Sequence, residues 1–414
     1  MALNKMLIVG KVWPEPKSSA AGSRMMQLIE AFQARDYQIT FASAASVNDF
    51  MADLEDLGIE TVLIELNNSS FDTFILKLNP QLVLFDRFMT EEQFGWRVAE
   101  TCPQALRILD TEDLHCLRAG REQAWKEDRE FRDSDLVSDI AKREIASIWR
   151  CDLSLIISET EMDLLKIFFK VEADLLLHLP FMLINLKEQE IENWPDFKSR
   201  EHFISIGNFL HEPNWNAVLY LKEEIWPLIR KELPNSELHI YGAYSSQKVE
   251  QLHNPKEGFL VKGRAVDSKE VVGNAKILLA PLRFGAGLKG KLIEAMQCGT
   301  PSVTTPIGAE SVNGELPWPG TIADDPKGIA ESAVNLYRDQ QVWECSQKNG
   351  IRVINERYSK KELEERLLNA ISKLQKNLES HRQNNFTGQM LHHHSMAGTK
   401  YMSKWIEAKN RITY

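Results

Sequence analysis

The chain has 414 residues, of which 43% are hydrophobic and 26% charged. This composition is typical of a globular protein and provides cores for two or three domains of about 150 residues each. Its 59 acidic residues exceed its 49 basic residues, which gives a formal net charge of −10. The acidic balance argues against a general nucleic-acid binder, which needs a basic surplus.

Cysteine usage and hydropathy bear on the compartment. The five cysteines are widely spaced and include no C-x-x-C pair, which predicts free thiols in a reducing compartment. No apolar run reaches the ~18 residues of a membrane-spanning helix. The apolar run at residues 6–9 is too short for the core of a signal peptide. We expect a cytoplasmic protein, and loose association with a membrane face stays open.

The chain begins with a strand, a glycine-containing loop and a helix. Residues 6–10 (MLIVG) predict a short buried strand, and residues 25–32 repeat apolar side chains at helical spacing. A doubly wound sheet places its ligand crevice after its first strand. One interpretation of Ala21-Gly22-Ser23 is therefore contact with a ligand phosphate or sugar. An ordinary strand-to-helix loop explains the same residues equally well.

Further apolar strands follow, separated by periodic helical stretches, and this alternation predicts βαβ units and a parallel sheet. The strands are expected at residues 38–42, 61–66, 82–86, 105–109 and 153–158.

Residues 117–150 differ in character, because they mix eight basic with eight acidic residues. We expect a long helical segment with a solvated charged face. An acceptor-recognition surface is the alternative.

A polar, proline-containing stretch at residues 188–201 marks a domain boundary, because strands restart at residues 203–207 and 237–242. We therefore predict an α/β protein with two Rossmann-like, doubly wound parallel-sheet domains that face one another across a cleft. The first spans residues 1–190 and the second 191–380. A helical tail, 381–414, is expected to pack back on the first domain.

The most informative stretch lies in the second domain, at residues 276–305. An apolar strand at 277–281 runs into a glycine turn at 283–287 and then into a helix that Gly299 and Pro301 end. A strand, a glycine turn and a helix together present free backbone N–H groups and a helix N-terminus to an anion.

Three cations, Arg283, Lys289 and Lys291, lie within nine residues around this turn. A phosphate bound there would meet N–H donors, the helix dipole and full positive charges together. A tight turn with solvated lysines is the plainer alternative.

The same stretch carries a recognisable set of motifs. They are Gly285-Ala286-Gly287, Lys289-Gly290-Lys291, Glu294-Ala295-Met296 and Gly299-Thr300-Pro301, with Gly207, Pro213-Asn214, Gly263, Asp267 and Asn274-Ala275 ahead of them. With these residues the chain resembles the nucleotide-sugar glycosyltransferases of family 4, the group 1 type with the GT-B fold. The likeness is good over residues 203–310 and only architectural elsewhere.

The resemblance implies a nucleotide-sugar donor, such as a UDP-sugar, bound mainly by the second domain. It also implies a hydroxyl acceptor bound mainly by the first domain, a retaining outcome, and no catalytic metal or other cofactor. The acceptor, whether a glycan, a lipid-linked molecule or a small molecule, and the oligomeric state are not indicated. Polysaccharide biosynthesis is the expected setting.

Residue roles follow from the same resemblance. Glu294 would bind the donor ribose hydroxyls, which a carboxylate accepts well, and the glycine turn with Lys289 and Lys291 would hold the diphosphate. The full set of expected donor-binding residues is Gly22, Ser23, Gly207, Asn208, Gly263, Arg264, Arg283, Gly285, Ala286, Gly287 and Leu288.

Two positions depart from the family pattern. Most relatives carry an acid eight residues before the glutamate, where this chain has Ala286. Many also place cations after the first strand of the second domain, where this chain has Asn208-Phe209-Leu210-His211. We infer that Arg283, Lys289 and Lys291 supply the missing charge.

On the acceptor side, Asp86, Asp110 and His115 lie at or near the ends of first-domain strands, where such sheets bind ligands. His115 either orients the acceptor hydroxyl or is a structural histidine.

Other functions compete with this interpretation. Gly285, Gly287 and Gly290 fit G-x-G-x-x-G, which alone is weak evidence for an NAD(P)-dependent oxidoreductase. The alanine at 286 keeps a catalytically silent GT-B binding protein in consideration.

A metal-dependent enzyme is disfavoured, because the Asp133-Ser134-Asp135 triplet falls inside the charged helical stretch. The triplet His392-His393-His394 chelates a metal poorly, since adjacent helical side chains point in different directions.

Overall fold

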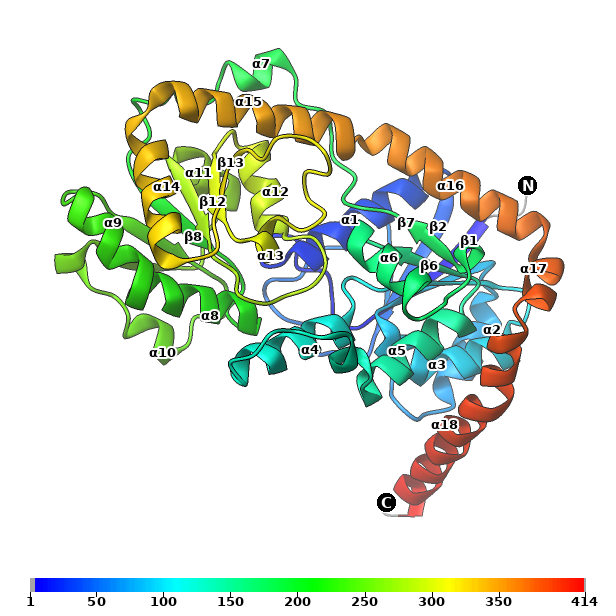
Figure 1. The fold of residues 1–414 in the computed structure, drawn as a ribbon. Helices are drawn as coiled ribbons and strands as arrows, with labels where there is room; N and C mark the ends of the chain where they lie inside the picture. The colour runs from blue at the N-terminus through cyan, green and yellow to red at the C-terminus, as the bar shows by residue number, and fades with distance from the viewer. Residues whose placement is uncertain (1–3, 413–414) are drawn as a thin grey trace.

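The computed structural model describes residues 4–412 and contains two parallel β-sheets, each within its own α/β domain (Figure 1). The first sheet has the order β3-β2-β1-β4-β5-β6-β7. Its strands are β1 (Asn4–Gly10), β2 (Tyr37–Ser43), β3 (Glu60–Leu63), β4 (Leu82–Asp86), β5 (Leu106–Asp110), β6 (Leu153–Ile156) and β7 (Leu176–His178). All of its pairings are parallel.

The second sheet repeats this topology with the order β10-β9-β8-β11-β12-β13. Its strands are β8 (Phe203–Ile206), β9 (Leu238–Tyr241), β10 (Phe259–Gly263), β11 (Ile277–Ala280), β12 (Ser302–Thr304) and β13 (Gly320–Ile322). The two doubly wound parallel sheets confirm the predicted fold class. In each sheet the strand order reverses once, between β1 and β4 and between β8 and β11, and ligands bind outside the carboxyl ends at such a point.

Helices cover both faces of each sheet. Those of the first domain are α1 (Ala20–Gln33), α2 (Ser70–Leu78), α3 (Phe88–Thr101), α4 (His115–Lys126), α5 (Asp139–Arg150) and α6 (Glu159–Ile167). The linker helix α7 (Glu188–Ile191) precedes α8 (Glu212–Tyr220), α9 (Trp226–Glu232), α10 (Gln247–Glu250), α11 (Ser268–Asn274), α12 (Gly290–Gln297), α13 (Pro306–Ala309), α14 (Pro326–Arg338) and α15 (Gln340–Arg357). The chain ends with α16 (Lys360–Lys376), α17 (Leu378–Asn384) and α18 (Phe386–Ile412).

The first strand shows why its sequence is continuously apolar. Leu7 and Val9 enter the core on one face of the sheet, whereas Met6 and Ile8 enter the core on the other. A parallel sheet with helices on both faces buries both sets of side chains, so its strands do not alternate with polar residues.

The chain crosses between the domains twice, and the two crossings lie side by side. The Leu183 N–H donates to the Tyr358 carbonyl at 2.7 Å, and the Lys360 N–H donates to the Leu183 carbonyl at 2.7 Å. Beyond this point α16 packs on the first domain, where Leu367 is fully buried in the core beside β1. The assignment of residues 360–380 to the second domain therefore needs correction, because their apolar stripe completes the core of the first.

The charged stretch at residues 117–150 forms two helices rather than one. After α4, Asp128 has φ of 50°, which a continuing right-handed helix does not allow. Ser138 then starts α5 by accepting the Ala141 N–H with its hydroxyl oxygen at 3.2 Å. The mixed charges hide this break, because charged residues favour both helices and loops.

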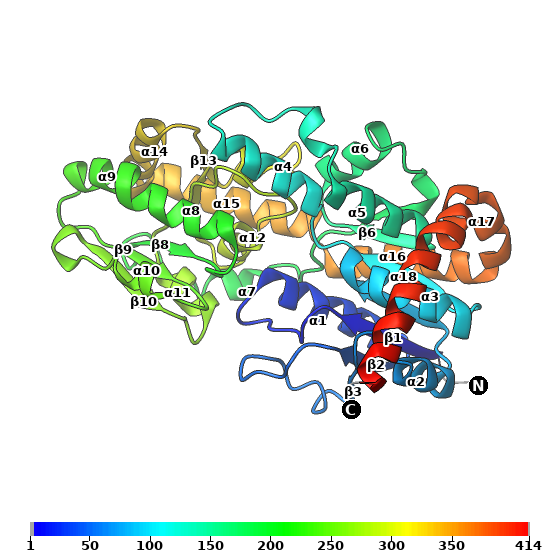
Figure 2. The same ribbon diagram turned by 90° about the horizontal axis from the view of Figure 1, so that it is seen from below.

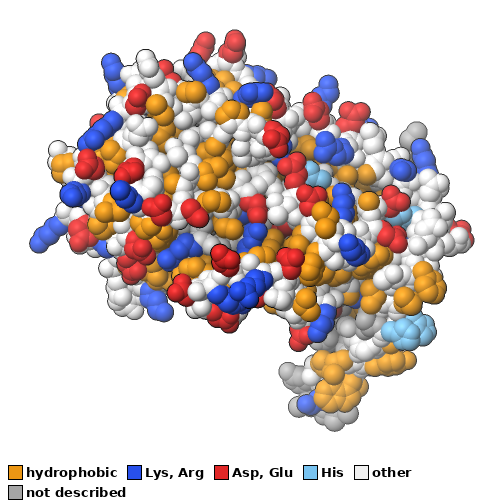
Figure 3. Space-filling view, viewed as in Figure 1, with side chains coloured by type: hydrophobic (Ala, Val, Ile, Leu, Met, Phe, Trp, Pro, Cys, Tyr) orange, Lys and Arg blue, Asp and Glu red, His pale blue; other side chains and the backbone are white. Residues whose placement is uncertain are grey.

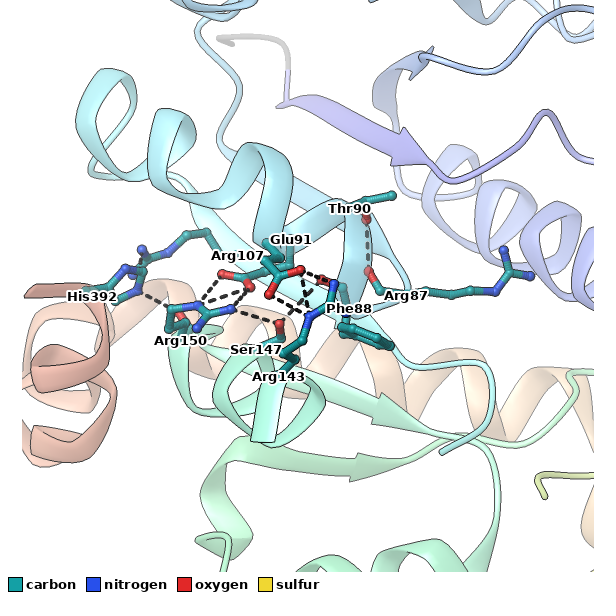
Figure 4. Close-up of polar contacts among 10 residues, drawn as sticks. Arg87, Phe88, Thr90, Glu91, Arg107, Arg143, Ser147, Arg150 and His392 are labelled. Atoms are coloured by element: carbon teal, nitrogen blue, oxygen red, sulfur yellow. Dashed lines mark hydrogen bonds and ion pairs between the residues drawn. The ribbon is translucent and has the colours of Figure 1, made fainter. Parts of the chain in front are cut away.

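The tail lies on the first domain, where α18 packs along α3 and α5 (Figure 2). His392 anchors it, with its ring Nε2 2.9 Å from both the Arg107 guanidinium and the Arg150 carbonyl (Figure 4). Burial, followed by the Arg107 charge, lowers the pKa of His392 to about 4. Among the described residues no cluster of His, Cys, Asp and Glu is suited to a metal ion. His392 therefore has a structural role, as an anchor of the tail.

Within residues 4–412, none of the helices combines the length and the apolar character needed to traverse a lipid bilayer.

Candidate active site

A cleft of about 1180 Å³ lies between the two domains, at the carboxyl ends of both sheets. Its walls come from the loops that follow β1, β4, β8 and β11, which are the strands that flank the two reversals of strand order. This is the position that doubly wound topology predicts for a ligand.

Two helix N-termini meet across this cleft. A Cβ atom placed on Gly290, the first residue of α12, would lie 2.5 Å from the Cβ of Ala20, the first residue of α1. The glycine thus allows the two domains to approach at the point where both helices present unpaired N–H groups and the positive ends of their dipoles. An anion bound here would interact with both domains.

The loop before α1 depends on Gly22, because a Cβ there would lie 2.4 Å from the Glu15 carbonyl. The Gly22 N–H donates to the Ser19 hydroxyl at 3.0 Å, and the Ser23 hydroxyl donates to the Pro16 carbonyl at 2.8 Å. Gly22 and Ser23, both expected to contact the donor, line the cleft. However, their polar groups shape the loop rather than pointing freely at a ligand.

Lys291 is the cation most available to an anion. Its Nζ donates to the Asn214 side-chain oxygen at 2.8 Å and lies against Gly207, where a Cβ would be 2.8 Å away. Burial lowers its pKa to about 8, and no carboxylate of the described chain offsets this effect. A partly buried ammonium without a counterion, beside a helix N-terminus, is suited to bind a phosphate.

Lys289 differs because carboxylates lie near its ammonium group. Its Nζ donates to the Gly287 carbonyl at 2.7 Å. Burial lowers its pKa to about 8, whereas the nearby Glu310 and Glu161 favour the charged form. Lys289 therefore holds the glycine turn, in the field of carboxylates from both domains.

The glycine turn itself packs against the first domain. The Gly287 N–H donates to Glu161 Oε1 at 2.9 Å, and a Cβ on Gly287 would lie 2.9 Å from the Asp113 Cβ. The Gly285 carbonyl accepts a hydrogen bond from Arg121 at 2.9 Å. Residues 285–288 line the cleft, but the Gly287 N–H that the sequence assigned to the diphosphate is bonded to Glu161.

Arg283 does not reach the cleft. Its Nε donates to the Asn216 side-chain oxygen at 2.8 Å, and its guanidinium stacks 4.3 Å from the Tyr220 ring centre and 4.7 Å from that of Trp125. Its expected role at the diphosphate is thus not supported by its position. The residue follows a strand, and the direction in which its side chain leaves the sheet was not evident from the spacing.

Glu294 lines the cleft one turn along α12 from Lys291. Its Oε1 accepts a hydrogen bond from the Ser268 hydroxyl, and burial raises its pKa. Asn208 also lines the cleft, and its carbonyl accepts from the Asn214 side-chain amide at 2.8 Å, which places Asn214 against Lys291.

Arg264 spans the two domains. Its guanidinium lies 4.2 Å from the centre of the Phe50 ring and donates to the Ser18 hydroxyl at 3.3 Å. The preceding Gly263 has φ of 73°, a conformation that glycine adopts without strain. Arg264 directly follows β10 and thus borders the cleft at the end nearest that strand.

The first-domain wall carries buried carboxylates paired with cations. Asp86 Oδ2 accepts the Lys11 N–H at 3.0 Å and pairs with Arg87 at 3.4 Å, whereas its Oδ1 is buried without a hydrogen-bond partner. Burial, then the Asp110 charge, raises the pKa of Glu112 to about 8. Glu112 and Arg87 both have positive φ, 63° and 68°. Strained non-glycine residues at neighbouring strand ends are typical of functional sites.

His115 and Asp110, both expected near the acceptor, have different environments. The ring of His115 lines the cleft with its Nδ1 3.1 Å from the Asp113 carbonyl, and its backbone N–H donates to Glu144 at 2.9 Å. Asp110 instead forms a fully buried ion pair with Arg24 at 2.9 Å. Asp110 therefore has a structural role, whereas His115 faces the site.

Several cleft residues gave no signal in the sequence. The Tyr244 hydroxyl donates to Glu15 at 2.8 Å across the two domains. His211 lies within electrostatic reach of Asp113, Arg118 and Lys291, and burial lowers its pKa to about 4. These contacts join residues far apart in the chain, so no local spacing could have revealed them.

Comparison with known proteins agrees with this geometry. Residues 200–339 match the model of the family described as glycosyl transferases group 1. No curated protein matches the chain significantly. This match lies within the second domain and agrees with the resemblance to group 1 glycosyltransferases found in the sequence.

Solved structures share the fold at low sequence identity. Sucrose-phosphate synthase from Thermosynechococcus elongatus matches with a TM-score of 0.63 and 14% identity over 89% of this chain and 98% of that one. Anabaena HepE in complex with UDP and glucose gives 0.65 and 12% over 89% and 99%. A point mutant of S. aureus TarM in complex with fondaparinux, α-GlcNAc-glycerol and UDP gives 0.56 and 16% over 72% of this chain. That match spans only 57% of the TarM mutant chain.

Proposed function

We propose that this protein transfers a sugar from a UDP-sugar to a hydroxyl group of an acceptor, without a metal ion. The observation that carries the proposal is the position of Lys291. Its ammonium has no counterion among the described residues, borders the cleft between the domains, and lies in the first turn of α12 opposite the N-terminus of α1. These are the properties of a diphosphate site.

In this proposal the nucleotide lies along the second-domain wall, with its diphosphate, ribose and base in that order from Lys291 toward Arg264. With the diphosphate at Lys291, the ribose hydroxyls are placed to donate to Glu294, one helical turn further along α12. The base then extends toward Arg264 and the end of β10. His211 lies within electrostatic reach of Lys291 and would gain a proton more readily beside a bound diphosphate.

The transfer forms one bond and breaks one. The acceptor oxygen bonds to the anomeric carbon of the sugar, and the bond from that carbon to the β-phosphate oxygen breaks. The departing UDP takes the electron pair, and the hydroxyl proton passes to its phosphate oxygen on the same face of the sugar, which retains the configuration. Lys291 and the N-terminus of α12 stabilise the negative charge that develops on the leaving group.

The acceptor binds the first-domain wall in this proposal. Asp86, whose Oδ1 is buried without a partner, and His115 both line the cleft. A sugar or other polyhydroxyl acceptor can donate a hydrogen bond to Asp86 and so relieve the cost of the unpaired oxygen.

The choice of UDP is supported by the neighbouring structures. HepE and the TarM mutant were each determined in complex with UDP, and both share the fold of this chain. The identity of the sugar is left to experiment.

Calorimetry with UDP, GDP, ADP and NAD+ tests the donor assignment, and hydrolysis of UDP-glucose and UDP-N-acetylglucosamine without acceptor tests for catalysis. We expect UDP to bind and at least one UDP-sugar to be turned over slowly. Binding of NAD+ in preference to UDP would instead indicate an oxidoreductase. UDP binding without any turnover, over a panel of acceptors, would indicate a silent binding protein.

A further inference from the structure

The outer face of α18 carries an apolar stripe that the fold leaves uncovered. Tyr401, Met402 and Trp405 are 68%, 57% and 59% exposed. Figure 3 shows orange hydrophobic side chains gathered on this projecting end of the helix. Large aromatic and apolar side chains rarely cluster on a free surface unless something binds there.

The other face of the same helix is fixed to the first domain. Ser403 accepts a hydrogen bond from the buried Arg97 at 3.1 Å, and Glu407 accepts the Ser69 N–H at 3.1 Å. Met396, two turns before Ser403, is also buried. Because these contacts determine the rotation of the helix, Tyr401 and Trp405 are held outward and cannot turn inward.

The charges along α18 differ from those of the chain. Residues 386–412 contain four Lys or Arg and one Glu, although the whole chain has a net charge of −10. Lys404 lies on one flank of the stripe, and Lys409 follows Trp405 one turn further along the helix, with its Nζ 5.3 Å from the centre of the Trp405 ring. A helix with an aromatic centre and lysine flanks suits the interface of an anionic bilayer.

We propose that the end of α18 docks the enzyme on the surface of an anionic lipid bilayer, with Tyr401, Met402 and Trp405 entering the headgroup region. The lysines attract the lipid phosphates, and the aromatic rings insert while their polar edges remain at the water boundary. A second copy of this chain fits less well, because packing two stripes together would also bring their flanking lysines together.

Nearby apolar residues extend the stripe onto the body of the first domain. Leu76, which is 65% exposed, lies one turn along α2 from Asp72, and Asp72 bonds to the same Arg97 that holds Ser403. The docking face thus includes the rigid domain as well as the terminal helix, so that membrane contact would orient the whole enzyme.

Sedimentation of the full-length protein with vesicles tests the proposal. We expect binding to vesicles of phosphatidylcholine with about one quarter phosphatidylglycerol, and at least about tenfold weaker binding to pure phosphatidylcholine or in about 0.5 M salt. Exchange of both Tyr401 and Trp405 for Ser should reduce binding by about tenfold or more. The matched control is Ile167→Ser with Val137→Ser, which removes two exposed apolar side chains elsewhere and should leave binding unchanged.

Each alternative result has a clear meaning. Absence of vesicle binding by the wild-type protein would overturn the proposal, as would equal binding by the double variant. A dimer seen by analytical ultracentrifugation that the double variant disrupts, without vesicle binding, would assign the stripe to a second copy and overturn it too. Circular dichroism of both variants checks that the exposed substitutions leave the fold intact.

Discussion

The two walls of the cleft share one architecture but differ in how their charged side chains are paired. Both are formed by loops at the carboxyl ends of parallel strands, at a point where the strand order reverses. The second-domain wall presents Lys291 without a counterion among the described residues, whereas on the first-domain wall Asp86 pairs with Arg87 and Asp113 pairs with Arg118. The fold thus provides the location of the site, and a few side chains decide which wall takes the anionic donor and which the acceptor.

A comparison of the two lysines on the second-domain wall refines this point. Lys289 and Lys291 both have pKa values of about 8, lowered by burial. Of the two, Lys289 has carboxylates nearby that favour its charged form. Proximity of a cation to the cleft therefore does not by itself make a phosphate site, and the lack of a counterion within the described chain is the more informative feature.

Replacing Lys291 with Ala should cause the largest loss, because it removes the charge that opposes the diphosphate. A hydrogen bond to a charged group contributes about 2 kcal/mol, or about thirtyfold in affinity. We expect UDP affinity to fall by about that factor and transfer to fall further. Calorimetry with UDP measures the effect. Unchanged affinity would show that Lys291 does not make the second-domain wall the donor site.

The variant Asp86→Asn tests whether the first-domain wall binds the acceptor and not the donor. Its Oδ1 would lose the negative charge that accepts the acceptor hydroxyl, so we expect turnover to fall about tenfold or more while UDP affinity changes less than about twofold. The asparagine is nearly isosteric and can still accept the Lys11 N–H. Parallel loss of UDP affinity would show that the first-domain wall also binds the donor.

The pH dependence of donor binding follows from the lowered pKa of Lys291. The amine loses its proton as pH rises above about 8, and a bound diphosphate favours the protonated form, so binding takes up a proton at high pH. We expect UDP affinity to fall by about tenfold per pH unit between about pH 8.5 and 9.5. Lys291→Met should remove this slope, and its persistence would point to Lys289 instead.

Glu294→Gln should have a smaller effect on the same wall. The neutral amide accepts the ribose hydroxyls less well than the carboxylate, at a cost of about 1 kcal/mol, or about fivefold in UDP affinity. Pyrophosphate, which lacks the ribose, provides the control and should bind the variant and the wild-type protein equally. Weaker pyrophosphate binding would place Glu294 near the phosphates rather than the ribose.

Arg283→Gln is expected to have the smallest effect on donor binding, below about twofold, because the side chain lies outside the cleft. Loss of its contacts with Tyr220 and Trp125 should instead lower the free energy of unfolding by about 1 kcal/mol. Denaturant unfolding measures that change. A large loss of UDP affinity with intact stability would restore the role first assigned to this arginine.

The sequence predicted the two parallel-sheet domains because long apolar strands and glycine turns are local signals. Leu82–Asp86, for example, is found as β4 with the expected bounds. It missed β7 and β13, which have only three residues each, and also β10 at Phe259–Gly263. It assigned α16 to the wrong domain, because a helical stripe does not indicate which core it completes.

The candidate site was predictable only in part. The motif located Lys291 and Glu294, since both lie on a short helix that starts at the glycine turn. It could not show that Glu161 takes the Gly287 N–H, that Arg283 turns away from the cleft, or that Glu112 adopts a strained backbone. Each of these depends on residues of another element or domain, and such contacts are determined by tertiary packing.

A crystal structure of the complex with UDP would show whether Lys291 binds the diphosphate. We expect the diphosphate in the cleft between the N-termini of α1 and α12, with a phosphate oxygen within hydrogen-bond distance of Lys291 Nζ and the ribose against Glu294. UDP bound elsewhere, or bound in the cleft with Lys291 still directed only at Asn214, would contradict it.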